Sequence, residues 1–172
     1  MKRLILPILF FCAGVCSAQT ANLLKGDADV EIDPSNMTNG SYSNSTAEAP
    51  KWKLDSATGY QSRSSIKLLE FCGIGIHDVK LPAGTYTFSF WAKGSEPDTR
   101  AYITVNKQDS SWPVALKNRA DSPIRLTTDW KRYSFTFTAD GVSRYSPYYG
   151  IEKQPAWFDR FMLNAGDKPL DW

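Results

Sequence analysis

The chain has 172 residues, of which 22% are charged and 13% are aromatic, with a formal net charge of +2. Residues 1–18 are predicted to be a secretory signal peptide, because Lys2 and Arg3 precede an apolar run that ends at the small pair Ser17-Ala18. Without Lys2 and Arg3, 18 basic residues balance 18 acidic ones. A neutral chain argues against nucleic acid and anionic lipid as partners, and no later segment has the length of a membrane helix.

Residues 19–172 are predicted to form a single secreted domain, which is expected to be a monomer. Cys12 and Cys16 leave with the signal peptide, so Cys72 remains alone and no intramolecular disulfide can form. We expect Cys72 to be a buried apolar side chain rather than a nucleophile. Lipidation at Cys16 is the alternative, but the preceding Ala13-Gly14-Val15 is a poor match to a lipoprotein signal.

Short stretches of alternating apolar and polar residues recur along the chain, and no window keeps a helical period. The clearest predicted strands are 65–70, 85–93, 101–106, 131–138, 148–152 and 156–163, with weaker ones near 23–30, 51–56, 74–80 and 114–118. Turn residues rich in Pro, Gly and Asp separate them, and a polar segment at 33–50 is predicted to be a surface loop. The pattern predicts an all-β sandwich or barrel.

Alternation also predicts which side chains lie on the outer faces of the sheets. In strand 85–93, Tyr86, Phe88, Phe90 and Ala92 are predicted to face the core. The outward set then includes Trp91, Lys93, Tyr102, Arg132, Tyr148 and Glu152. An aromatic ring beside hydrogen-bonding groups suits a sugar, whose C–H face stacks while its hydroxyls bind polar side chains. The alternative is a solvated sheet face whose aromatic residues reflect strand propensity.

Two motifs are specific enough to indicate a family. Leu81–Lys93 reads LPAGTYTFSFWAK, and Leu126–Phe137 reads LTTDWKRYSFTF, between an opening Asn22-Leu23-Leu24 and a closing strand that contains Asp159. In this order they resemble the galactose-binding-like jelly-roll carbohydrate-binding modules attached to secreted glycoside hydrolases, particularly the xylan- and glucan-binding groups. The resemblance implies a β-sandwich jelly roll that binds a polysaccharide or oligosaccharide, in association with a secreted glycosidase.

The resemblance also implies two sets of functional residues. Glu31 and Asp159 are expected to hold a structural calcium ion, Ca2+, with Asp27 or Asp29 as helpers. The alternative is that Asp159 accepts backbone N–H bonds and Glu31 is exposed. The resemblance implies that Glu152 and Tyr148 bind the ligand, with Trp52 and Tyr60 as further candidates. Together with the outward faces of the strands, the expected ligand-binding residues are Trp52, Trp91, Lys93, Tyr102, Arg132, Tyr148 and Glu152.

Two other classes of function stay open at this point. A small jelly-roll hydrolase or lyase would use carboxylates, or Tyr102, Tyr148, Lys93 and Arg132 as acid and base. The single histidine, His77, has no serine or cysteine partner at a recognisable spacing. A structural or adhesive surface protein is the third class, with Trp112 or the terminal Leu170-Asp171-Trp172 as a docking edge.

Overall fold

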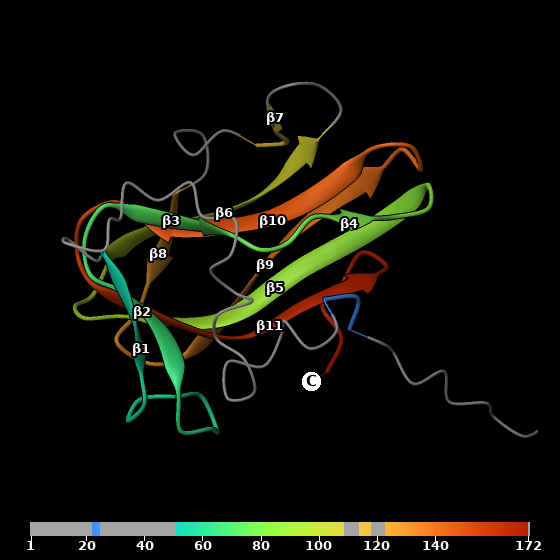
Figure 1. Cartoon of the computed structure of the whole chain (residues 1–172). Coiled ribbons are helices and arrows are strands. Elements are labelled where there is room, and N and C mark those ends of the chain that lie inside the picture. The colour runs from blue at the N-terminus through green and yellow to red at the C-terminus, as the bar shows by residue number, and fades with distance from the viewer. Residues whose placement is uncertain (1–21, 25–50, 109–113, 118–122, 172) are drawn as a thin grey trace, which may run out of the picture.

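The computed structural model describes residues 22–24, 51–108, 114–117 and 123–171, which form two antiparallel sheets packed face to face (Figure 1). The predicted β-sandwich is therefore confirmed. The signal peptide, Asp27, Asp29, Glu31, Trp112 and the 33–50 loop lie outside the described residues. Within the described residues, no helix is long and apolar enough to cross a membrane.

We call the five-stranded sheet sheet A, and its order is β1-β2-β11-β5-β9. Its strands are β1 (Trp52–Asp55), β2 (Ser65–Leu68), β5 (Gly84–Gly94), β9 (Lys131–Ala139) and β11 (Ala156–Ala165). Residues 22–24 are attached to β11, since the Leu23 N–H donates to the Leu163 carbonyl at 2.8 Å. The last strand of the chain therefore lies in the middle of its sheet.

The second sheet, sheet B, has the order β3-β10-β6-β7, with β4 also paired to β10 and β8 also paired to β6. Its strands are β3 (Cys72–Gly75), β4 (Val79–Lys80), β6 (Thr99–Gln108), β7 (Val114–Ala115), β8 (Pro123–Leu126) and β10 (Arg144–Ile151). The predicted strand 74–80 is two strands in the structure, because β3 ends at Gly75 and β4 begins at Val79. The predicted strand 148–152 covers only the second half of β10, which begins at Arg144. Strand β8 was not predicted, since it begins with a proline and has only two apolar residues.

The core lies between the two sheets and is largely aromatic. The side chains of Tyr86, Phe88, Phe90 and Ala92 are at most 6% exposed, which confirms the predicted inner face of β5. Phe90 of sheet A packs against Tyr149 of sheet B at a ring-centroid distance of 5.8 Å. These contacts fix which face of each sheet remains outside and available for binding.

A β-bulge in β11 adjusts its register against β5. Asp159 lies opposite Trp91 but Met162 lies opposite Ser89, so β11 holds one extra residue. Arg160, at φ 47, occupies the left-handed region at this point. The bulge allows both Phe158 and Phe161 to point into the core at 0% exposure, although simple alternation would place them on opposite faces.

The buried position predicted for Cys72 is confirmed, since this residue is 1% exposed on the inner side of β3. Burial raises the pKa of its thiol to about 11. We expect Cys72 to remain unmodified by a thiol-specific reagent at pH 8 and to react fully once the protein is unfolded. Thiol titration with and without denaturant tests this, and rapid labelling of the native protein would contradict the described position.

Candidate functional site

Two tyrosines form an aromatic pair on the outer face of sheet B. Tyr102 of β6 and Tyr148 of β10 stack with ring centroids 5.9 Å apart and an interplanar angle of 20°. Their strands are neighbours, with Tyr148 opposite Thr104 and Tyr102 opposite Gly150. Both side chains have the outward orientation that alternation predicts. Tyr102 is only 2% exposed, however, so the partly exposed Tyr148 presents more ring surface.

Two glycines provide the floor on which these rings rest. A Cβ at Gly150 would overlap the hydroxyl of Tyr102, and one at Gly73 would overlap the hydroxyls of both tyrosines. The missing side chains let the Tyr102 ring lie across the sheet, where its hydroxyl donates to the Cys72 carbonyl at 3.3 Å. The result is a flat aromatic platform over β3, β6 and β10.

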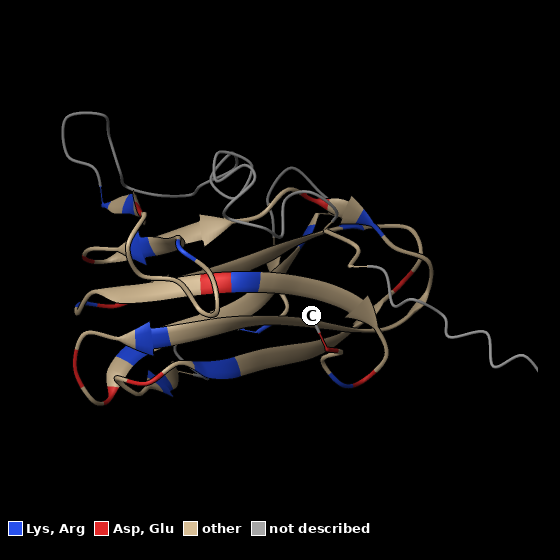
Figure 2. Cartoon of the chain, turned by 90° about the horizontal axis from the view of Figure 1, so that it is seen from below, with Lys and Arg blue, Asp and Glu red and all other residues tan. Residues whose placement is uncertain are grey.

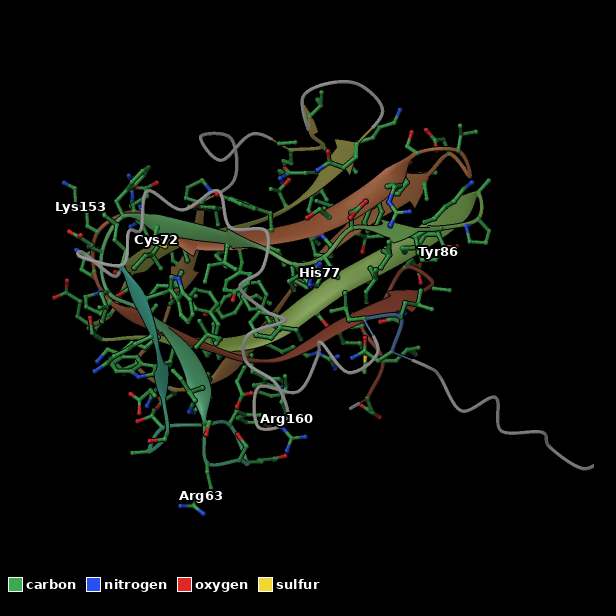
Figure 3. All side chains as sticks on the ribbon, in the orientation of Figure 1. Arg63, Cys72, His77, Tyr86, Lys153 and Arg160 are labelled. Atoms are coloured by element: carbon green, nitrogen blue, oxygen red, sulfur yellow. The ribbon has the colours of Figure 1, made fainter. Side chains whose placement is uncertain are left out.

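Charged groups border this platform at one end. Arg100 of β6 donates to Glu152, which follows β10, with an Nη1–Oε2 distance of 3.2 Å. The pair lies in an open depression of about 290 Å³ that is lined by Asp98, Arg100, Arg125, Glu152, Lys153 and Gln154. Lys153 lies in the turn between β10 and β11, at the margin of the molecule (Figure 3). Such groups are suitable partners for sugar hydroxyls beside a stacked ring.

Three further predicted ligand residues lie on the opposite side of the molecule, on the outer face of sheet A. Trp91, Lys93 and Arg132 come from β5 and β9, and Trp91 lies opposite Arg132. The seven candidates therefore do not form a single site. Only Tyr102, Tyr148 and Glu152 come together on sheet B.

Segments of the chain cover Trp91 and Arg132 on sheet A. Tyr60, in the connection between β1 and β2, stacks on Trp91 at a centroid distance of 3.7 Å and an angle of 11°. Arg132 donates to the Ser89 hydroxyl at 3.1 Å and to the carbonyl of Leu170 in the C-terminal segment. Burial lowers the pKa of the Arg132 guanidinium. Both side chains thus hold other parts of the chain in place.

Trp52 begins β1 at the edge of sheet A, opposite Leu68. It is partly buried and packs against the hydrophobic core. Trp52 belongs to sheet A, whereas the tyrosine platform lies on the outer face of sheet B. In the described structure Trp52 is therefore a packing residue.

Asp159 attaches the β1–β2 connection to sheet A. Its Oδ2 accepts the Tyr60 N–H and the Ser62 hydroxyl, each at 2.7 Å, and its Oδ1 accepts the Arg160 N–H at 2.7 Å. The Arg160 guanidinium donates to the carbonyls of Tyr60 and Gln61 at 3.0 and 3.1 Å. Figure 3 shows Arg160 beside this connection, which carries Arg63 at its tip. Asp159 is 2% exposed, and desolvation by burial raises its pKa.

The residues described around Asp159 do not by themselves form a calcium centre. Both carboxylate oxygens accept hydrogen bonds, and the described part of the chain contains no group of three or more His, Cys, Asp or Glu residues that could hold a metal. The expected second ligand, Glu31, lies outside the described residues. The calcium site therefore stays a prediction, while the alternative of backbone N–H bonds to Asp159 is present in the structure.

The glycine floor and the Tyr60–Trp91 stack were not predicted from the sequence. Gly73 and Gly75 alternate within a strand and Gly150 interrupts another, which is a signal for a close approach to the backbone. Tyr60 gives no such signal, since its partner is 31 positions away in sequence on a different element.

Comparison with known proteins gives a family match over part of the chain and a shared fold. Residues 76–149 match the family CBM_4_9, described as a carbohydrate binding domain. This range includes Tyr102 and Tyr148. The resemblance inferred from the sequence is confirmed. No curated protein sequence matches the chain.

Solved carbohydrate-binding modules share the fold. The CBM22-1 xylan-binding domain of Paenibacillus barcinonensis Xyn10C aligns with a TM-score of 0.54 at 15% identity, over 76% of this chain and 94% of that one. The module TmCBM61, solved with β-1,4-galactotriose, aligns with a TM-score of 0.56 at 17% identity, over 86% and 100%. The family 30 module of Clostridium thermocellum Cel9D-Cel44B aligns with a TM-score of 0.53 at 14% identity, over 75% of this chain and 92% of that one.

Proposed function

We propose that this chain is a secreted, non-catalytic carbohydrate-binding module that holds a polysaccharide or oligosaccharide on the outer face of sheet B. The observation that carries the proposal is the Tyr102–Tyr148 pair on its glycine floor, bordered by Arg100 and Glu152. A sugar ring would stack on the Tyr148 side of the platform, and Arg100 and Glu152 would hydrogen-bond its hydroxyls. The family match supports this class of ligand, as do two structural neighbours, a xylan-binding domain and a module in complex with a galactotriose.

Affinity electrophoresis through gels cast with xylan, mixed-linkage glucan, mannan or β-1,4-galactan tests the proposal on residues 19–172. We expect retardation in at least one gel, with no reducing sugar released. Release of reducing sugar would assign a hydrolase instead, and a rise in absorbance from an unsaturated product would assign a lyase. No retardation in any gel would contradict carbohydrate binding and favour a protein partner.

Replacement of Tyr148 by alanine is expected to weaken binding to the retained glycan about tenfold, because it removes the more exposed ring of the pair. Tyr60→Ala is the matched control, since it removes one ring of a stacked pair on the opposite sheet. Isothermal titration of both variants makes the comparison. Equal losses in the two variants would contradict the assignment of the site to sheet B.

A further inference from the structure

A row of lysines and tryptophans crosses the outer face of sheet A, on the opposite side from the tyrosine platform. The strand register places Lys53 of β1 opposite Lys67 of β2, Lys67 opposite Trp157 of β11, and Trp157 opposite Lys93 of β5. Trp130, just before β9, continues the row, with its ring 5.4 Å from the Lys93 ammonium. At the usual strand spacing the row from β1 to β5 is roughly 14 Å long. Figure 2 shows basic segments on neighbouring strands toward one end of the sandwich.

The three lysines of this row form no ion pair within the described residues. The Lys67 ammonium lies 4.2 Å from the centre of the Trp157 ring, and that of Lys93 lies 5.2 Å from the same ring. Like charges directly opposite each other on neighbouring strands, such as Lys53 and Lys67, destabilise a sheet. A bound anion would remove this repulsion.

A carboxylate beside the row, that of Asp55, accepts a hydrogen bond from one of its tryptophans. Its Oδ2 accepts the Trp157 indole N–H at 2.8 Å, and its Oδ1 accepts the Ala57 N–H at 3.1 Å. The first of these bonds is the main cause that lowers the Asp55 pKa, with smaller contributions from Lys67 and Lys53. Asp55 therefore orients the indole between the lysines and only partly offsets their charge.

The shape of the row suits one extended chain. The row is a single line of side chains across the sheet, and Tyr60, whose ring lies 6.1 Å from that of Trp130, borders it. The ammonium and indole groups in this one row match a ligand that carries both charged substituents and apolar C–H faces. A membrane or a duplex would need a broader basic surface than this single row of three lysines.

We propose that this lysine–tryptophan row is a second glycan site, which binds an anionic polysaccharide through its carboxylates or sulfates. It is separate from the site on sheet B, so the two can be tested independently. With both sites filled, one molecule would hold two polysaccharide chains on opposite faces.

Affinity electrophoresis with polygalacturonate, with dextran sulfate and with a neutral glycan tests this inference. The triple variant Lys53→Gln, Lys67→Gln, Lys93→Gln is expected to bind at least one anionic polymer about tenfold more weakly than the wild type does. Binding of that polymer should also weaken as salt is raised. Preference for polygalacturonate would identify carboxylates as the recognised groups, and preference for dextran sulfate would identify sulfates.

Lys80→Gln, on β4 of sheet B, is the matched charge control and should bind the anionic polymer normally. Tyr148→Ala should also retain anionic binding, which separates this inference from the site on sheet B. Failure of the wild type to bind either polymer would overturn the inference, as would equal losses in the triple variant and in Lys80→Gln. Binding to phosphatidylglycerol vesicles without binding to either polymer would overturn it in favour of a membrane surface.

Discussion

Replacement of Asp159 by alanine is expected to lower the free energy of unfolding by about 2–3 kcal/mol. The substitution leaves three donors without their acceptor, namely the backbone N–H groups of Tyr60 and Arg160 and the Ser62 hydroxyl. Removal of a buried carboxylate also relieves its desolvation, which limits the loss. Denaturant unfolding followed by tryptophan fluorescence measures the change.

The effect of Asp159→Ala should be local as well as global. Tyr60 would lose the hydrogen bond that holds it on Trp91, so its amide should exchange hydrogen faster than amides in β6. Ser62→Ala, which removes one of the three donors, should cost less. If Asp159→Ala unfolds at the same denaturant concentration as the wild type, the described attachment of the β1–β2 connection is wrong.

The same variant tests the calcium prediction. We propose that Glu31 joins Asp159 in holding calcium in the complete chain, as the resemblance implies. The wild type would then melt at a higher temperature in calcium than in EDTA, and Asp159→Ala would melt at the same temperature in both. A wild-type melting temperature that does not respond to calcium would leave Asp159 with its hydrogen-bonding role alone.

Asp159→Asn isolates the pH dependence of this group. Burial raises the pKa of Asp159 above its value in the unfolded chain, so the folded state binds the proton more readily. The contribution of this group to stability is therefore largest below the unfolded pKa and declines as pH rises through the folded pKa. In EDTA, where no calcium can be bound, we expect the deficit in unfolding free energy of Asp159→Asn relative to the wild type to shrink over that rise, as measured by urea unfolding at a series of pH values. A deficit that grows would contradict the raised pKa.

Replacement of Gly150 by alanine is expected to abolish the aromatic platform. The new Cβ would overlap the Tyr102 ring, and it would also lie 2.5 Å from the Cys72 carbonyl oxygen, which the backbone of β3 holds in place. The Tyr102 ring would have to leave its position, and the Cys72 carbonyl cannot yield without a shift of β3, so we expect a loss of about 1–3 kcal/mol in stability. Binding of the glycan retained by the wild type should fall at least as far as it does in Tyr148→Ala.

Gly166→Ala provides the matched control for this prediction. Gly166 has φ +106 but open space around its Cβ position, so an alanine there costs only backbone strain and leaves the platform intact. Calorimetry and glycan titration of the two variants distinguish these effects. Normal glycan binding by Gly150→Ala would show that the flat floor is not required.

The long strands were predictable because their inner faces repeat with a period of two. Tyr86, Phe88 and Phe90 lie opposite Phe137, Phe135 and Tyr133, as two motifs with matching alternation require. Which side chains of β11 face the core was less predictable, since an extra residue at Arg160 changes the alternation in mid-strand. Nothing in the composition of that segment identifies where the extra residue falls.

The candidate site was only partly predictable, because alternation assigns a side chain to an outer face without saying which sheet it belongs to. Trp91 and Tyr148 are both outward, yet they lie on different sheets. Exposure was also unpredictable, because it depends on what later folds over the face. Trp91 and Arg132 are covered by segments remote in sequence. In the same way, a formal net charge of only +2 gave no sign of three lysines in one row.

The central position of β11 has a consequence for the order of folding. β11 is the last strand of the chain, yet β2 and β5 both pair with it. During synthesis these two strands have no partner between them until residues 156–165 have been made. Sheet A can therefore close only when residues 156–165 have left the ribosome, and the long sequence separation of its pairings predicts slow folding. A chain that stops before Ala156 would expose two strand edges and is expected to aggregate rather than form a smaller domain.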